Sequence, residues 1–167
     1  LHPVCEAVGA IIGLSAGLVA PGVTGVAGAV IGWLLLASAA TDWAAFWLPN
    51  GLMIAIGLAG FTLSELPWDS RLIGGAVGYG SLWLIAKGYK RWRGRDGLGG
   101  GDAKLFGAIG LWLGWRALPA VLLTASLAGL LIALALRMRR DARLPLGTLL
   151  AGAAFAMWVL LHALDRF

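Results

Sequence analysis

The chain has 167 residues, of which 60% are hydrophobic and 13% charged. This composition excludes an ordinary soluble protein and indicates one membrane-embedded domain, residues 1–167. The net charge of +5 does not indicate a nucleic-acid partner, because most of the thirteen Lys and Arg residues lie in two short loops. The single cysteine, Cys5, allows no disulfide or cysteine-based metal site within these residues.

Seven apolar runs follow one another along the chain. They cover residues 4–20, 23–40, 51–63, 72–86, 103–115, 118–136 and 146–164. Most are apolar on all sides, as expected for helices in lipid, although several are shorter than the ~20 residues of a straight span. The sequence therefore predicts an all-α fold, a polytopic membrane bundle of about seven transmembrane helices. The 26 glycines favour close packing between these helices.

The basic residues predict the orientation of this bundle. They gather in the loops 87–98 and 137–144, which are separated by two spans and so lie on one side of the membrane. Because cytoplasmic loops are enriched in Lys and Arg, we expect that side to be cytoplasmic. The loop 41–49 and the N-terminus then face the cytoplasm as well, and the C-terminus faces out.

Two aspartates are predicted to lie at this cytoplasmic level. Asp42 follows the second apolar run, and Asp102 follows a glycine-rich stretch and leads into the fifth. An ionisable residue inside a membrane segment is costly, and it is by default a candidate for function. The ordinary alternative is a flexible linker whose aspartate stabilises the start of a helix. Glu6 is the one other acid near that level inside a helix.

Two carboxylates brought together can perform acid–base chemistry without a metal or cofactor. They cannot both ionise easily, so the pair shares a proton near neutral pH. One can activate a water while the other polarises a peptide carbonyl and later protonates the leaving amine. A serine nucleophile is disfavoured, because the histidines, His2 and His162, lie near opposite ends of the chain. We therefore expect neither a cofactor nor a bound metal.

The residues around the two aspartates resemble motifs of the prepilin peptidases, or type IV leader peptidases, which are membrane aspartic proteases of the GxGD type. Residues 99–105, GGGDAKL, resemble the family's GxGDxKL, and Asp42 precedes LPN at 48–50 by the family's spacing. Similar flanks cover nearly the whole chain. They are HPVCE at 2–6, GLWLGW at 110–115 and RLPLG at 143–147.

The resemblance implies a role for each matching residue. Asp42 and Asp102 would be the catalytic pair, while Gly99 and Gly101 would let the loop admit an extended substrate backbone. Lys104 would orient the motif or meet lipid phosphate as a snorkelling lysine.

Two further positions carry weaker expectations. Pro49 belongs to the second motif and to the expected substrate loop. Glu6 would be structural or would help to bind substrate, and we do not expect it to be catalytic.

The resemblance implies an endopeptidase of the bacterial inner membrane that removes the leader of type IV prepilins or type II secretion pseudopilins at the cytoplasmic face. Cleavage would follow a glycine that precedes an apolar helix. Many members also carry two Cys-x-x-Cys pairs and methylate the new N-terminus with S-adenosylmethionine; those cysteines are absent from these residues, so we expect cleavage without methylation. Expected partners are the substrate and membrane lipid, with no nucleic acid; the oligomeric state is left open.

One alternative from a different class is a small proton-coupled transporter or assembly subunit. It would also use intramembrane carboxylates, but near the middle of spans and beside broken helices.

Overall fold

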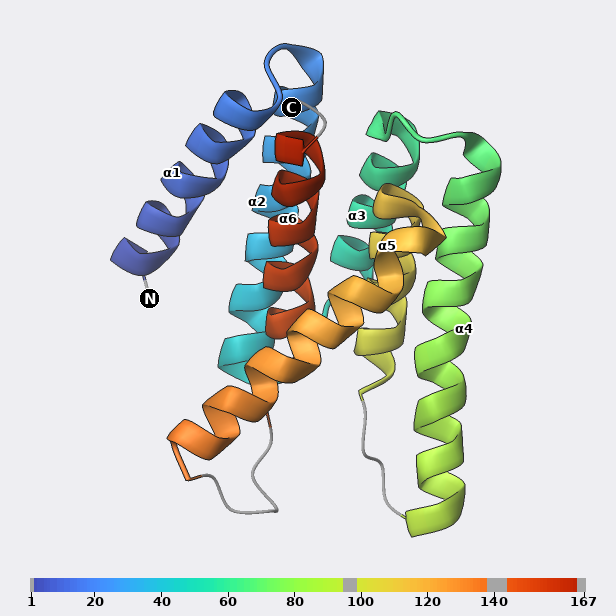
Figure 1. Cartoon of the computed structure of the whole chain (residues 1–167). Coiled ribbons are helices and arrows are strands. Elements are labelled where there is room, and N and C mark those ends of the chain that lie inside the picture. Colours follow the sequence, from blue (N-terminus) through green and yellow to red (C-terminus); the bar gives the residue numbers. More distant parts are fainter. Residues whose placement is uncertain (1, 95–98, 138–143, 165–167) are drawn as a thin grey trace.

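The computed structural model describes residues 2–94, 99–137 and 144–164. These residues form helices joined by short connections, without strands in the described ranges (Figure 1). The helices are α1 (His2–Val19), α2 (Val23–Ala45), α3 (Asn50–Leu63), α4 (Trp68–Arg93), α5 (Gly100–Ala135) and α6 (Leu146–Leu164). The expected all-α fold is thus confirmed.

The expected seven transmembrane helices are not confirmed. The described residues hold six helices, of which α2, α5 and α6 are long and apolar enough to cross a membrane. The helices α1 and α3 are apolar but shorter, and α4 carries a basic last turn. The difference in number comes from α5, which combines two of the predicted runs into one sharply bent element.

The bend in α5 lies at Gly114, where φ is 71° and ψ is 172°. Such a positive φ favours glycine, and a Cβ here would lie 2.8 Å from Ser70 Oγ and 2.9 Å from Leu66 Cδ1. The sequence had suggested a turn at residues 116–119 instead, yet Pro119 lies inside the second half of α5. Figure 1 shows the consequence: α5 rises to the bend and then descends as a long oblique helix.

The first half of α5 is the centre of the bundle. It packs against α3, α4 and α6, and nearly all residues from 102 to 114 are buried. Its contact with α4 brings two backbones together, because a Cβ at Gly74 would lie 2.2 Å from Gly110 O. Small residues permit this approach between membrane helices. Asp102 therefore begins the most enclosed helix of the molecule.

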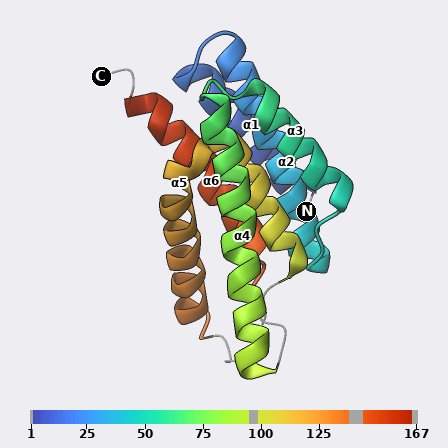
Figure 2. The same ribbon diagram turned by 90° about the vertical axis from the view of Figure 1, so that its right-hand side faces the viewer.

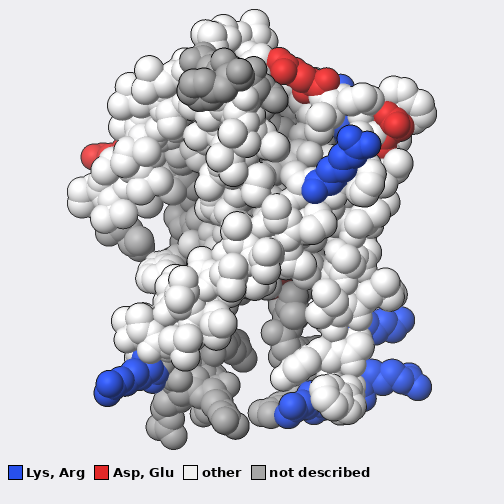
Figure 3. Space-filling model, in the orientation of Figure 1, with Lys and Arg blue, Asp and Glu red and all other residues white. Residues whose placement is uncertain are grey.

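Both views place the lower end of α4 and the end of α5 at the same end of the molecule (Figures 1 and 2). Lys and Arg side chains gather at this end, whereas acidic side chains lie near the opposite end (Figure 3). The predicted basic loops fall largely on residues outside the described ranges. The helix ends that flank them agree with the prediction that both loops lie on one side.

Candidate active site

Asp42 lies in the last turn of α2 and is buried, with 5% of its surface exposed. Its Oδ2 accepts a hydrogen bond from the backbone N–H of Thr148, at 2.8 Å, and lies 3.2 Å from the Thr148 hydroxyl oxygen. The C-terminal end of a helix is an unfavourable position for a carboxylate, whereas the N-terminal end attracts one. Thr148 belongs to the first turn of α6, so that helix provides the compensating donors.

Asp102 lies in the first turn of α5 and is 8% exposed. Its Oδ2 accepts a hydrogen bond from the backbone N–H of Gly99 at 3.1 Å, and the Asp102 N–H donates to the Gly99 carbonyl at the same distance. This reciprocal pair caps the start of α5. The capping arrangement anticipated by the ordinary reading is therefore present, and it fixes the carboxylate in the protein interior.

The fold brings the two aspartates together from α2 and α5. They lie near enough for their carboxylates to interact electrostatically. Within the described residues, the buried polar or charged side chains are these two and Ser38, whose hydroxyl bonds Leu35 of its own helix. Two buried acids without a basic partner are unusual, because burying charge without pairing is costly.

Leu48 packs between the backbones that carry the pair. A Cβ at Gly101 would lie 2.9 Å from Leu48 Cβ, and a Cβ at Gly147 would lie 3.0 Å from Leu48 Cδ1. The same Cβ at Gly147 would lie 2.9 Å from Asp42 Oδ2. The two glycines therefore let Leu48 and Asp42 approach the starts of α5 and α6. The space beside Gly101 is filled by Leu48 in this structure.

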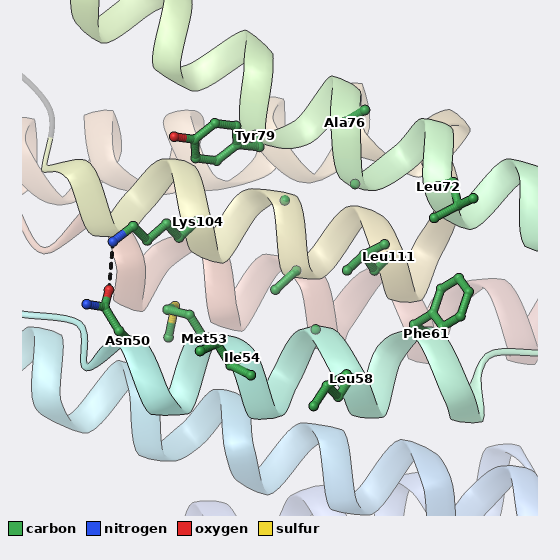
Figure 4. Close-up of a pocket in the computed structure, with 14 residues that line it drawn as sticks. Asn50, Met53, Ile54, Leu58, Phe61, Leu72, Ala76, Tyr79, Lys104 and Leu111 are labelled. Atoms are coloured by element: carbon green, nitrogen blue, oxygen red, sulfur yellow. Dashed lines mark hydrogen bonds between the residues drawn. The ribbon is translucent and has the colours of Figure 1, made fainter.

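Lys104 and Asn50 link the two motifs across neighbouring helices. The Lys104 ammonium donates a hydrogen bond to Asn50 Oδ1 at 2.7 Å, as Figure 4 shows. Pro49 precedes α3 in an extended conformation, and its carbonyl accepts from Met53 N at 3.2 Å. Of the two readings offered for Lys104, the contact to Asn50 agrees with an orienting role.

An apolar cavity of about 830 Å³ extends from this link along α3, α4 and α5. Lys104 and Asn50 lie at one end of it, and Phe61 and Leu72 lie at the other (Figure 4). Gly57 also lines it, so the helices come close around a shallow apolar space. A polar group could enter only at the end near the motifs.

The remaining sequence candidate, Glu6, is exposed on α1, which packs against α2 and α6. The structure thus buries Asp42 and Asp102 together and leaves Glu6 at the surface. Sequence reasoning missed Thr148, the nearest polar neighbour of Asp42. The available signal was its position directly after the motif at 143–147, at the predicted start of a helix on the cytoplasmic side.

The sequence profile of the type IV leader peptidase family matches residues 29–134, which include both aspartates. The chain belongs to this family. Its relatives include the prepilin leader peptidase/N-methyltransferase of Klebsiella pneumoniae, 42% identical over 130 residues, covering 75% of this chain and 57% of the relative. The enzyme of the same name from Aeromonas salmonicida (strain A449) is 32% identical over 169 residues, covering 96% and 57%.

A third relative of that name, from Burkholderia pseudomallei (strain K96243), is 39% identical over 132 residues, covering 73% of this chain and 42% of the relative. The chain thus spans about half the length of these curated relatives. No solved structure matches it. Together with the apolar helices, the relatives indicate a bacterial membrane protein.

Proposed function

We propose that this chain is a membrane aspartic endopeptidase that removes the leader peptide of type IV prepilins or of type II secretion pseudopilins. The observation that carries the proposal is the buried pair Asp42 and Asp102, held at the ends of two helices. Family membership supports the substrate class, since the relatives bear the name prepilin leader peptidase.

The proposed chemistry needs the two carboxylates and a water. One carboxylate removes a proton from the water, whose oxygen attacks the carbonyl carbon of the scissile peptide. The other, protonated, donates a hydrogen bond to the carbonyl oxygen as it gains charge. A proton then passes to the leaving nitrogen, and the C–N bond breaks. The proton gained by one carboxylate replaces the proton given by the other, so the pair returns to its starting state.

The location of the pair supports the proposed side of cleavage. Asp42 and Asp102 lie toward the end of the bundle where α4 ends in Lys90, Arg91 and Arg93. If the positive-inside rule holds for this chain, that end faces the cytoplasm across the bacterial inner membrane. A leader retained on that side would reach the aspartates, while the apolar helix that follows it stays in lipid.

Replacement of each aspartate tests the proposal. Asp42→Asn and Asp102→Asn keep the shape of the side chain and remove its acid–base function, so membranes containing either variant should leave a prepilin uncleaved. Asp69→Asn is the matched control, because Asp69 is exposed in the first turn of α4. Normal cleavage by either of the first two variants would overturn the two-aspartate mechanism.

We propose that residues 1–167 cleave but do not methylate, although the relatives' name includes N-methyltransferase. The larger cavity in the described residues is lined mostly by apolar side chains, which suits lipid or an apolar peptide better than a charged cofactor. Labelled S-adenosylmethionine, prepilin and membranes lacking any other methyltransferase provide the test. Label on the mature pilin would contradict this part of the proposal.

The transporter alternative is disfavoured by the same positions. It expects carboxylates near mid-span, whereas Asp42 lies in the last turn of its helix and Asp102 in the first turn of its own.

A further inference from the structure

Asp42 receives its printed hydrogen-bond contacts from one residue of another helix, and this residue lies beyond the stretch matched to the family. Thr148 approaches Asp42 Oδ2 with its backbone N–H at 2.8 Å and with its hydroxyl oxygen at 3.2 Å. The family profile ends at residue 134, before α6 begins. No assigned role therefore accounts for this double contact.

The Thr148 hydroxyl also lies 2.9 Å from the carbonyl oxygen of Ala39, one turn before Asp42 on α2. A threonine hydroxyl has one hydrogen to donate and lone pairs to accept with. The carbonyl of Ala39 can only accept. The hydroxyl therefore cannot donate to Ala39 and to Asp42 at the same moment, although it lies within reach of both.

Each choice of donor suits one protonation state of Asp42. When Asp42 is ionised, the hydroxyl can turn its hydrogen to Oδ2, so that the carboxylate accepts from both the N–H and the O–H of Thr148. When Oδ2 carries a proton, it can donate that proton to the hydroxyl oxygen, whose own hydrogen then goes to Ala39. The exchange needs only rotation of one O–H bond, and no heavy atom has to move.

We propose that Thr148 is a positioning residue for Asp42, which holds the carboxylate in the same place in both of its protonation states. This inference rests on the proposed function, because a peptidase aspartate must alternate between these states during each cycle. Thr148 acts through Asp42 and is not itself assigned contact with substrate.

The test compares Thr148→Val with Thr148→Ser. Valine has nearly the shape of threonine and keeps the backbone N–H, but it has no hydroxyl, whereas serine keeps the hydroxyl. For Thr148→Val we expect kcat for prepilin cleavage to fall on the order of tenfold to a hundredfold, since a misplaced catalytic group is costly. KM should stay within about twofold, because uniform substrate binding is untouched. Thr148→Ser should recover most of the lost kcat.

Thr124→Val is the matched control, because the Thr124 hydroxyl bonds carbonyls of its own helix, Ala120 at 2.8 Å and Val121 at 3.0 Å. The control should cleave like the unmodified chain. The proposal is overturned if Thr148→Val retains normal kcat, if serine does not rescue, or if Thr148→Val fails to fold, since the hydroxyl would then serve the fold. Failure of the proposed function would appear separately, as normal cleavage by Asp42→Asn.

Discussion

At the scale of single residues, the site depends on side chains that are absent as much as on those that are present. Asp42 can accept the Thr148 N–H only because Gly147, the preceding residue, leaves room for the carboxylate. A methyl group at Gly147 would lie 2.9 Å from Asp42 Oδ2 and 3.0 Å from Leu48 Cδ1. Both neighbours are themselves held by packing, so they cannot move aside without cost.

Gly147→Ala should therefore displace Asp42 and reduce prepilin cleavage by on the order of tenfold or more. Gly152→Ala on the same helix is the control, because its Cβ would meet nothing within 4 Å. Cleavage rates of the two variants, normalised to folded protein, give the comparison. Equal rates would show that Asp42 can shift without loss of activity.

The glycine-rich motif contains its own matched pair. A Cβ at Gly101 would lie 2.9 Å from Leu48 Cβ, whereas a Cβ at Gly100 would meet nothing within 4 Å. We expect Gly101→Ala to lower the rate of cleavage by roughly tenfold because it pushes Leu48 away from the pair. Gly100→Ala should cleave normally. A reversed order would mean that the loop needs glycine for backbone freedom and not for its contact with Leu48.

At the scale of helices, the contact between α4 and α5 determines where Asp102 lies. The two backbones meet at Gly74 and Gly110, and a Cβ at Gly78 would lie 2.6 Å from Phe106 O. A main-chain neighbour cannot swing away as a flexible side chain can. The first half of α5 is therefore fixed against α4 over two turns, and the aspartate at its start is fixed with it.

Gly74→Ala should destabilise the protein by about 1–3 kcal/mol, the usual cost of inserting volume into a packed contact. Thermal unfolding in detergent measures this as a lowered Tm. Gly80→Ala lies on the same helix, where a Cβ would meet nothing within 4 Å. Its Tm should stay level or rise, because alanine favours helix over glycine. A Tm for Gly74→Ala equal to that of Gly80→Ala would mean that the helices can separate there without cost.

Sequence reasoning found the helices that apolar runs define and missed features set by contacts between them. The turn at Pro21-Gly22 was visible because proline and glycine punctuate the sequence. The bend at Gly114 was placed too late, because that glycine is one among many and only the packing of Leu66 and Ser70 singles it out. The helix α4 extends beyond its apolar run, since a basic segment can continue a helix outside the apolar region.

The same limit applies to the site. Asp42 and Asp102 could be predicted because a carboxylate is conspicuous in an apolar chain, and the loop order placed both at one membrane level. The contact from Thr148 could not be predicted, because 106 positions separate it from Asp42. The role of Leu48 between two glycines likewise depends on three segments meeting, which hydrophobic periodicity does not encode.

At the scale of the whole molecule, the side on which the pair lies depends on whether α4 crosses the membrane. Its composition does not place it among the three candidate spans, but its 26 residues give a length of about 39 Å, more than the ~30 Å of a hydrocarbon core. Asp69 lies in its first turn and Arg93 in its last, and both are exposed. If α4 crosses, these two residues lie on opposite sides, with Arg93 on the side of the aspartate pair.

The chain offers a direct test, because replacing its single cysteine with Cys5→Ser gives a cysteine-free background. In that background, Asp69→Cys should react with a membrane-impermeant thiol reagent in intact cells from which the outer barrier has been removed. Arg93→Cys should react only after the inner membrane is permeabilised, because the basic end of α4 is expected to stay inside. Cleavage activity of both variants confirms that they are folded. Labelling of both cysteines from the same side would show that α4 does not cross, and the argument for a cytoplasmic active site would fall with it.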